Sequence, residues 1–241
     1  MTEQSGFTEY SGLDELLAIE KSMPNYNKFI VSKFTKLLKN PDNLTIVDFG
    51  AGIGTLSRII HELSGQDPLC VEIDKINRCY LKERGFQIFN MCDDIPEEID
   101  AIFSSNVLEH IEDDVAILKS FYKNLNENGI LFLYLPAFNF LFSGLDKKVG
   151  HFRRYDKKSL KEKMKSCGFD VKHFEYADSF GFFDSIAMKI FGYNEELGLG
   201  SQKSLVFYDK YILPISKFAD SLGFKYIFGK NILITAQKMP D

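Results

Sequence analysis

The feature that most constrains the fold is an alternation of short apolar runs and amphipathic segments between residues 44 and 176. The apolar runs are rich in β-branched and aromatic residues, which predicts buried strands at 44–49, 69–73, 86–90, 99–104 and 130–135. The segments at 54–63, 75–84 and 113–125 have the spacing and the terminal residues of helices. Apolar strands that alternate with helices predict a parallel sheet covered on both faces.

The remaining segments extend this core at both ends, and we expect a single domain over residues 1–241. Helical spacing of apolar residues predicts an N-terminal helical cap at 1–40. Residues 44–178 would form the ligand-binding core, and the aromatic-rich residues 179–225 a helical insertion or lid. Residues 226–238 would supply the final strand.

Composition narrows the class of protein. The apolar fraction is 45% and the net charge is −5, which is typical of a globular domain and does not indicate nucleic-acid binding. The four cysteines contain no CxxC pair and the four histidines show no ligand spacing, so neither a disulfide framework nor a metal site is expected. No signal peptide or membrane-spanning stretch is evident, and we expect a cytoplasmic protein.

A glycine-rich turn joins the first predicted strand to its helix, with glycines at positions 50, 52 and 54. In a parallel sheet this turn lies at the carboxyl edge, where ligands bind. A dinucleotide fingerprint would require a third glycine at position 55, where Thr55 stands instead. An acid at the end of the second strand, Glu72, can accept both hydroxyls of a ribose, which fits a dinucleotide as well as other nucleoside cofactors.

Four strand-end motifs together carry a resemblance to a known family. The G-x-G-x-G turn preceded by Asp48 resembles motif I of the class I S-adenosylmethionine-dependent methyltransferases, and residues 104–114 (SSNVLEHIEDD) resemble the motif after their fourth strand. The resemblance extends from Asn25 to Asn231. It implies a Rossmann-like, mostly parallel sheet of seven strands with helices on both faces and an antiparallel last strand.

The resemblance also implies the cofactor, S-adenosyl-L-methionine, with S-adenosyl-L-homocysteine as the product. Asp48 would face the cationic amino acid moiety, and Asn106 would contact the methionine part. Asp93 would reach the adenine, with Cys92 and Asp94 as alternatives because the family's usual Gly-Asp pair is missing. The predicted cofactor-binding residues are Tyr26, Asp48, Gly50, Ala51, Gly52, Gly54, Glu72, Ile73, Asp93, Asn106 and Val107.

The acceptor side is expected in the segment after the fifth strand, residues 136–155. His151 is the leading candidate for a general base, because its ordinary pKa suits proton removal at neutral pH. Arg153 and Tyr155 are assigned to catalysis with it. Alternatively, the two arginines, Arg153 and Arg154, pin the loop by pairing with nearby acids. His110 is a weaker candidate for a base, because the family resemblance favours a structural role for it.

The predicted reaction is methyl transfer by in-line displacement to a small-molecule or glycan-like acceptor, the latter because the late segments resemble a bacterial subgroup associated with glycan assembly. The methylated atom can be O, N or C, and a base is needed only for a hydroxyl or a protonated amine. The alternatives are an NAD(P)-dependent oxidoreductase and a non-catalytic cofactor-binding module. Residues 179–224 form a core or lid, or else a docking surface for lipid or a partner, which leaves room for peripheral membrane contact; the oligomeric state stays open.

Overall fold

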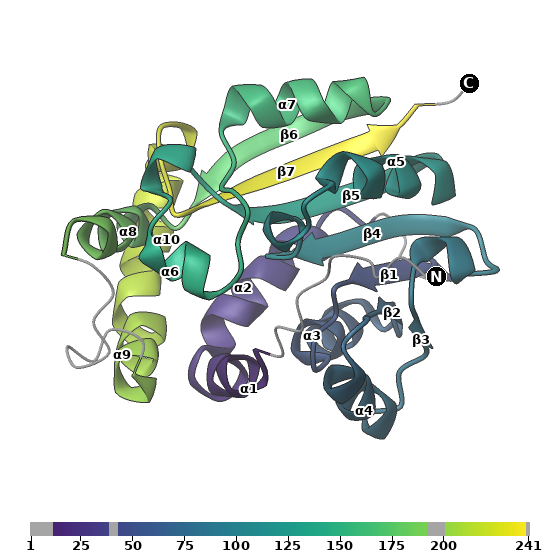
Figure 1. Cartoon of the computed structure of the whole chain (residues 1–241), viewed down its shortest axis with the longest axis horizontal. Helices are drawn as coiled ribbons and strands as arrows, with labels where there is room; N and C mark the ends of the chain where they lie inside the picture. The colour runs from purple at the N-terminus through teal and green to yellow at the C-terminus, as the bar shows by residue number, and fades with distance from the viewer. Residues whose placement is uncertain (1–11, 39–42, 192–200, 240–241) are drawn as a thin grey trace, which may run out of the picture.

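The centre of the computed structural model is one seven-stranded sheet, and residues 12–38, 43–191 and 201–239 are described (Figure 1). The strand order is β3-β2-β1-β4-β5-β7-β6. The strands are β1 (Ile46–Phe49), β2 (Leu69–Val71), β3 (Ile88–Phe89), β4 (Ile99–Ser105), β5 (Leu125–Pro136), β6 (Phe169–Ala177) and β7 (Asn231–Lys238). β7 is antiparallel to β5 and β6, and the remaining pairs are parallel. The Rossmann-like fold predicted from the sequence is therefore confirmed.

Helices cover both faces of the sheet because successive strand residues point to opposite sides. Val47 and Ile102 pack in one core with α5 (Asp114–Asn124) and α7 (Lys157–Ser166). The neighbouring residues Ile46 and Phe103 pack in a second core with α2 (Pro24–Thr35) and α3 (Thr55–Ser64). Figure 1 shows these two helical layers above and below the strands.

The helix α4 (Lys75–Glu83) packs through Leu81 against Cys70 of β2 and Ile88 of β3. The remaining helices are α1 (Leu13–Ser22), α6 (Gly144–Lys148), α8 (Ser179–Phe191), α9 (Gln202–Phe207), a π-helical turn (Tyr208–Ile212) and α10 (Leu213–Ser221). The described parts of the predicted cap and insertion are thus helical, whereas residues 1–11, 39–42 and 192–200 lie outside the described residues. No helix among the described residues is long and apolar enough to cross a bilayer.

Several predicted strand bounds need correction: β1, β2 and β3 are shorter than predicted, and two other strands begin at different residues. The final strand begins at Asn231 and not at 226, because residues 224–226 form a short 3₁₀ turn. The fifth strand begins at Leu125 and not at 130, because Leu125 already pairs with Ile99 of β4. A register shift between Ile99 and Ala101 accommodates the extra residues.

Candidate active site

The turn after β1 forms the floor of the candidate site, and its three glycines all have positive φ angles. The Gly50 amide donates to the Val71 carbonyl over 2.8 Å. A Cβ at Gly50 would lie 2.3 Å from Val107 Cγ2, so this glycine is required by packing. A Cβ at Gly52 would meet only the Leu16 side chain of α1, at 3.3 Å. The helix α1 therefore lies over the turn.

The carboxylate of Glu72 is held against this turn. Its Oε2 accepts the Gly52 amide over 2.8 Å, and its Oε1 accepts the amides of Ile73 and Asp74. Burial raises the pKa of Glu72, and these three amides oppose the shift. A carboxylate has about four acceptor positions, so Glu72 keeps capacity for a further donor. The Ile73 side chain beside it is exposed.

Three further predicted cofactor residues, Asp48 before the turn and Ala51 and Gly54 within it, contact the neighbouring helices. Asp48 is 2% exposed and accepts a hydrogen bond from the Ser57 hydroxyl over 2.6 Å. Burial raises its pKa to about 7. Ala51 packs in a small apolar cluster with Leu81 of α4. A Cβ at Gly54 would overlap the same leucine. Asp48 therefore faces α3, and Ala51 and Gly54 join the turn to α4.

The segment after β4 borders the turn on its other side. Asn106 has a φ angle of 53°, its amide donates to the Tyr134 carbonyl, and its side chain is exposed. Val107 contacts the Gly50 position, as described above. Tyr26 of α2 lies near the end of β5, where its hydroxyl hydrogen-bonds with Tyr134 and Asn231. The predicted residues Tyr26, Asn106 and Val107 are thus at the same carboxyl edge as the glycines.

The three candidates after β3 have different environments. Asp93 forms an ion pair with Lys123 at 2.5 Å and accepts the Ser120 hydroxyl, so α5 occupies both of its oxygens and lowers its pKa. Cys92 is buried in the core, and Asp94 accepts the Met91 amide. Asp93 and Asp94 each bind a partner within the protein, and Cys92 is buried. The geometry therefore does not show which of the three would contact the adenine.

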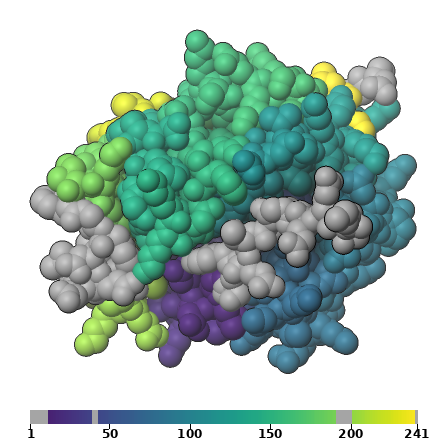
Figure 2. All heavy atoms as spheres, in the orientation of Figure 1, coloured from purple at the N-terminus to yellow at the C-terminus, as the bar shows by residue number. Residues whose placement is uncertain are grey.

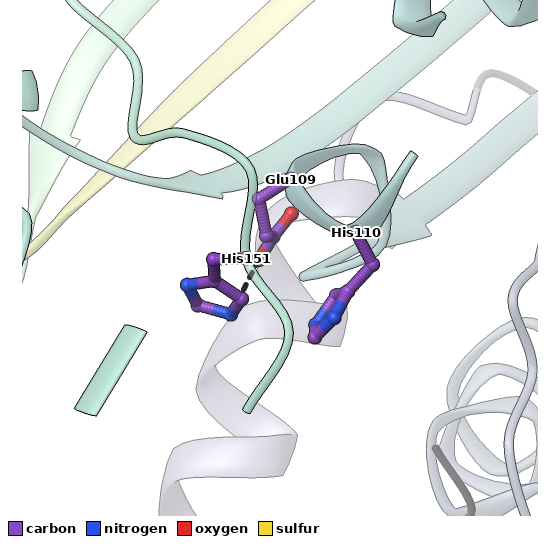
Figure 3. Close-up of side chains that lie close together, drawn as sticks. All are labelled: Glu109, His110 and His151. Carbon is purple, nitrogen blue, oxygen red and sulfur yellow. Dashed lines mark ion pairs between the residues drawn. The ribbon is translucent and has the colours of Figure 1, made fainter. Parts of the chain in front are cut away.

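Glu109, His110 and His151 lie close together, although they come from two separate segments (Figure 3). Glu109 and His110 lie in a 3₁₀ turn (Leu108–His110) directly after Val107. His151 follows α6, and its Nδ1 is 2.9 Å from Asp146 Oδ1 while its Nε2 is 4.0 Å from Glu109 Oε1. The two imidazole rings meet edge to face, with centroids 4.5 Å apart.

Burial controls the charges in this cluster. It raises the pKa of Glu109 to about 8 and lowers the pKa of His110 to about 4, with His151 adding to the second shift. Burial would also raise the pKa of Asp146, but hydrogen bonds from His151 and Arg154 outweigh it and hold this pKa below its usual range. The cluster thus contains an ionised Asp146 and a neutral His110 at neutral pH.

The other residues predicted for catalysis are turned toward α5. Tyr155 is 3% exposed, and its hydroxyl donates to Asp114 Oδ2 over 2.8 Å. Arg153 Nη1 lies 3.0 Å from Asp114 Oδ1. Arg154 instead pairs with Asp146 over 2.8 Å. Asp114 and Asp146 therefore hold the loop, and the structure does not bring Arg153 or Tyr155 to the cluster of His151.

Sequence reasoning named no role for Glu109 or Asp114 and considered Asp146 only as a partner of an arginine. All three are almost completely buried acids, with exposures of 0%, 2% and 1%. The available signal was their place in the string after β4 and in the loop after β5. Two shallow hollows of the described surface lie at the opposite edge of the sheet, near Asp100 and Gly129, and contain none of the candidate residues.

Solved structures with the same fold are methyltransferases. A chain in the complex between the Haloferax volcanii Trm112 methyltransferase activator and a methyltransferase is 11% identical, with a TM-score of 0.66, over 99% of this chain and 100% of that one. A Haemonchus contortus phosphoethanolamine N-methyltransferase 2, in complex with phosphomonomethylethanolamine and S-adenosylhomocysteine, is 17% identical (TM-score 0.61; 100% and 62% covered). A SAM-dependent methyltransferase from Archaeoglobus fulgidus is 16% identical (TM-score 0.57; 92% and 99% covered).

No curated protein matches the sequence. The family model of the methyltransferase domain matches residues 24–173, which is more than half of the chain and includes the glycine turn, Glu72 and the Glu109–His110–His151 cluster. The fold, the strand-end residues and this match agree, and the chain therefore belongs to the methyltransferase-domain family.

Proposed function

We propose that this chain transfers a methyl group from S-adenosylmethionine to a small-molecule or glycan-like acceptor. The observation that carries the proposal is the pairing of Glu72 with the Gly52 amide, which fixes a carboxylate with spare acceptor capacity over a glycine turn. Thr55 at the third glycine position disfavours the NAD(P)-dependent oxidoreductase. Thr55 is also the first residue of α3, so the chain lacks the third glycine that lets the helix pack closely on the strand in a dinucleotide-binding fold.

In this proposal the cofactor lies across the carboxyl edge between β1, β2 and β4. Glu72 accepts the ribose hydroxyls, and the exposed Ile73 covers one side of the adenine. The methionine part extends toward Asn106 and Val107, with Tyr26 at its far end and the backbone of residues 50–54 beneath it. Asp48 acts through the turn, since its carboxylate is bound to Ser57.

The chemical step requires alignment more than activation, because the sulfonium is already a good leaving group. A lone pair of the acceptor forms the bond to the methyl carbon as the carbon–sulfur bond breaks. The electron pair of the broken bond stays on sulfur, and the product is S-adenosylhomocysteine. A hydroxyl or protonated amine must also lose a proton. The His151 cluster, immediately after the Val107 segment, supports a part for His151 in removing it; Arg153 and Tyr155 fix the loop.

Calorimetric titration tests the cofactor half of the proposal. The full chain should bind S-adenosylmethionine and S-adenosylhomocysteine and should not bind NAD⁺ at comparable concentrations. Binding of NAD⁺ alone would favour the oxidoreductase. Binding of the methyl donor without turnover of any alcohol, amine or saccharide in an acceptor panel would favour the non-catalytic module.

The surface of residues 201–230 is the basis for a second part of the proposal, which concerns the surface that the enzyme docks on. Apolar side chains at helical spacing form an exposed stripe along α9 and α10, which includes Phe207 (56%), Phe218 (65%) and Leu222 (66%). Figure 2 shows part of this segment, in yellow-green, at the margin of the molecule beside the purple N-terminal helices. An exposed apolar surface of this kind marks a docking site.

The charges of the same segment favour an anionic membrane as the occupant. Lys203, Lys210 and Lys217 are exposed beside the stripe, while the two acids of the segment, Asp209 and Asp220, are buried. The protein as a whole is acidic, so this basic face is a local feature. A basic amphipathic helix with aromatic side chains lies in the interface of anionic bilayers.

Vesicle flotation tests the membrane contact. The parent should float with vesicles that contain phosphatidylglycerol, and a Lys210→Glu/Lys217→Glu variant should bind at least about tenfold more weakly, since each lysine near an anionic surface is worth roughly 1 kcal/mol. Lys158→Glu/Lys165→Glu on the exposed side of α7 is the matched control. Equal flotation of both variants, or none of the parent, would remove this part of the proposal.

A further inference from the structure

The cluster of Glu109, His110 and His151 has the geometry of a metal site. One ligand atom from each of the three side chains lies within 4.8 Å of the other two (Figure 3). Two imidazoles and one carboxylate are a donor set for divalent transition metals such as Zn²⁺, Mn²⁺, Fe²⁺ and Co²⁺. Two tetrahedral ligands with metal bonds of about 2.1 Å lie about 3.4 Å apart. His151 Nε2 and Glu109 Oε1, which are 4.0 Å apart, would therefore move about 0.6 Å closer together on binding a metal.

Glu109 supplies an independent observation that points to a ligand. Its side chain is 0% exposed, and neither of its oxygens has a hydrogen-bond partner among the described residues. A buried carboxyl group without hydrogen bonds to other residues is unfavourable in its charged form, so it binds a proton unless a positive charge compensates it. His151 Nε2 lies 4.0 Å from Glu109 Oε1, which is too far for a hydrogen bond. The carboxylate is therefore directed into the cluster with its acceptor capacity unused.

The groups behind the ligands orient the two rings. His151 Nδ1 hydrogen-bonds to Asp146, which leaves Nε2 directed at Glu109. His110 hydrogen-bonds to the backbone at Val149, and the Phe152 amide donates to the Glu109 carbonyl over 2.8 Å. A carboxylate or carbonyl behind each ligating histidine is the usual arrangement in metal sites, where it sets the tautomer and the ring orientation.

The local charge also favours a cation. Glu109 and Asp146 provide two carboxylates, and Arg154 is the guanidinium that pairs with Asp146. A divalent ion bound by the cluster would place its positive charge next to the Glu109 carboxyl group.

We infer that Glu109, His110 and His151 bind a divalent transition-metal ion at the acceptor side of the site. Three protein ligands leave positions for water or for an acceptor oxygen. Resting on the proposed function, the ion would act as a Lewis acid that lowers the pKa of an acceptor hydroxyl, so that its proton leaves to solvent as the oxygen takes the methyl group. His151 then acts as a ligand.

Metal titration of the full, tag-free chain tests this inference. After dialysis against a chelator and then against metal-free buffer, Co²⁺ is added and its visible absorption is followed. The parent should bind one Co²⁺ per chain with the absorption of a nitrogen- and oxygen-ligated site. Glu109→Gln and His151→Gln should each weaken binding at least tenfold, and Asp146→Asn by roughly 10- to 100-fold. His61→Gln, an exposed histidine on α3, should bind like the parent.

The outcomes separate this inference from the proposed function. No stoichiometric Co²⁺ binding, or equal binding in the parent and in folded Glu109→Gln, would overturn the metal site. His110→Gln serves the same purpose if circular dichroism shows that Glu109→Gln is unfolded. S-adenosylhomocysteine binding is measured on the same samples: if it persists without Co²⁺ binding, only the metal site fails, and if it is absent from the parent, the proposed function fails.

Discussion

Gly50, Gly52 and Gly65 have positive φ angles of 76°, 55° and 75° but different neighbours. Alanine substitutions at the three positions therefore separate backbone strain, packing and ligand binding. An alanine in the left-handed region costs about 1–2 kcal/mol. Gly65→Ala should show this strain alone, because its Cβ would meet nothing within 4 Å. Gly52→Ala should lose a similar amount, because its nearest neighbour, the end of Leu16 at 3.3 Å, can move.

Gly50→Ala should be distinctly less stable than the other two variants. Its Cβ would lie 2.3 Å from Val107 Cγ2, and overpacking of this kind costs about 1–3 kcal/mol beyond the strain. In a chain of this size each kcal/mol lowers the melting temperature by about 2–4 °C. Val107→Ala in the Gly50→Ala background should recover part of the loss, because it removes both overlapping methyl groups.

The same variants test the position of the cofactor. Gly52→Ala should bind S-adenosylhomocysteine at least about tenfold more weakly, a loss of roughly 1.4 kcal/mol, while Gly65→Ala should bind like the parent. Thermal unfolding by circular dichroism and calorimetric titration measure the two effects. If Gly52→Ala binds as tightly as Gly65→Ala, the cofactor does not lie against this turn. If the three melting temperatures coincide, the packing argument for Gly50 is wrong.

Three further substitutions address single groups of the site. Glu72→Ala should weaken S-adenosylhomocysteine binding about tenfold or more, since a charge-assisted hydrogen bond is worth about 1.5–3 kcal/mol, and unchanged calorimetric affinity in a folded variant removes Glu72 from the site. Because burial raises the Asp48 pKa from 3.8 to about 7, its contribution to stability is present below about pH 4 and lost as pH rises through 7. The free energy of unfolding of Asp48→Asn, measured in urea, should therefore rise relative to that of the parent between pH 5 and pH 8, by at most on the order of 4 kcal/mol. If the two free energies change in parallel with pH, this reasoning is wrong. His151→Ala should lower kcat about 10²- to 10⁴-fold on an acceptor from the panel and leave cofactor affinity within a few fold; near-parental kcat leaves alignment as the source of catalysis.

The fold was largely predictable from the sequence because most strands are rich in apolar residues, and glycines or acids follow several of them. The first and last residues of the strands were harder to predict, because they depend on backbone pairing with neighbouring strands. Leu125 belongs to β5 through its pairing with Ile99, although the apolar run itself begins only at Ile130. The predicted last strand began at Tyr226, but Tyr226 ends an exposed 3₁₀ turn, and strand pairing begins only at Asn231.

The candidate site was predictable only where its residues are close in sequence. The glycine turn and Glu72 follow from two adjacent strands and their order. The Glu109–His110–His151 cluster does not, because His151 comes from a loop 41 residues after His110. These residues therefore show no metal-ligand spacing along the chain, since only the tertiary structure brings His151 to Glu109 and His110.

The loop of residues 150–155 shows why residue type alone does not separate catalytic from supporting roles. Two of its side chains, Arg153 and Tyr155, bind Asp114 and fasten the loop to α5. The other two polar side chains, His151 and Arg154, bind Asp146 within the same insertion. A reacting or ligating imidazole must be held to within about 0.5 Å, which a surface loop does not achieve without such anchors. The arginines and the tyrosine therefore provide the rigidity that lets His151 face Glu109.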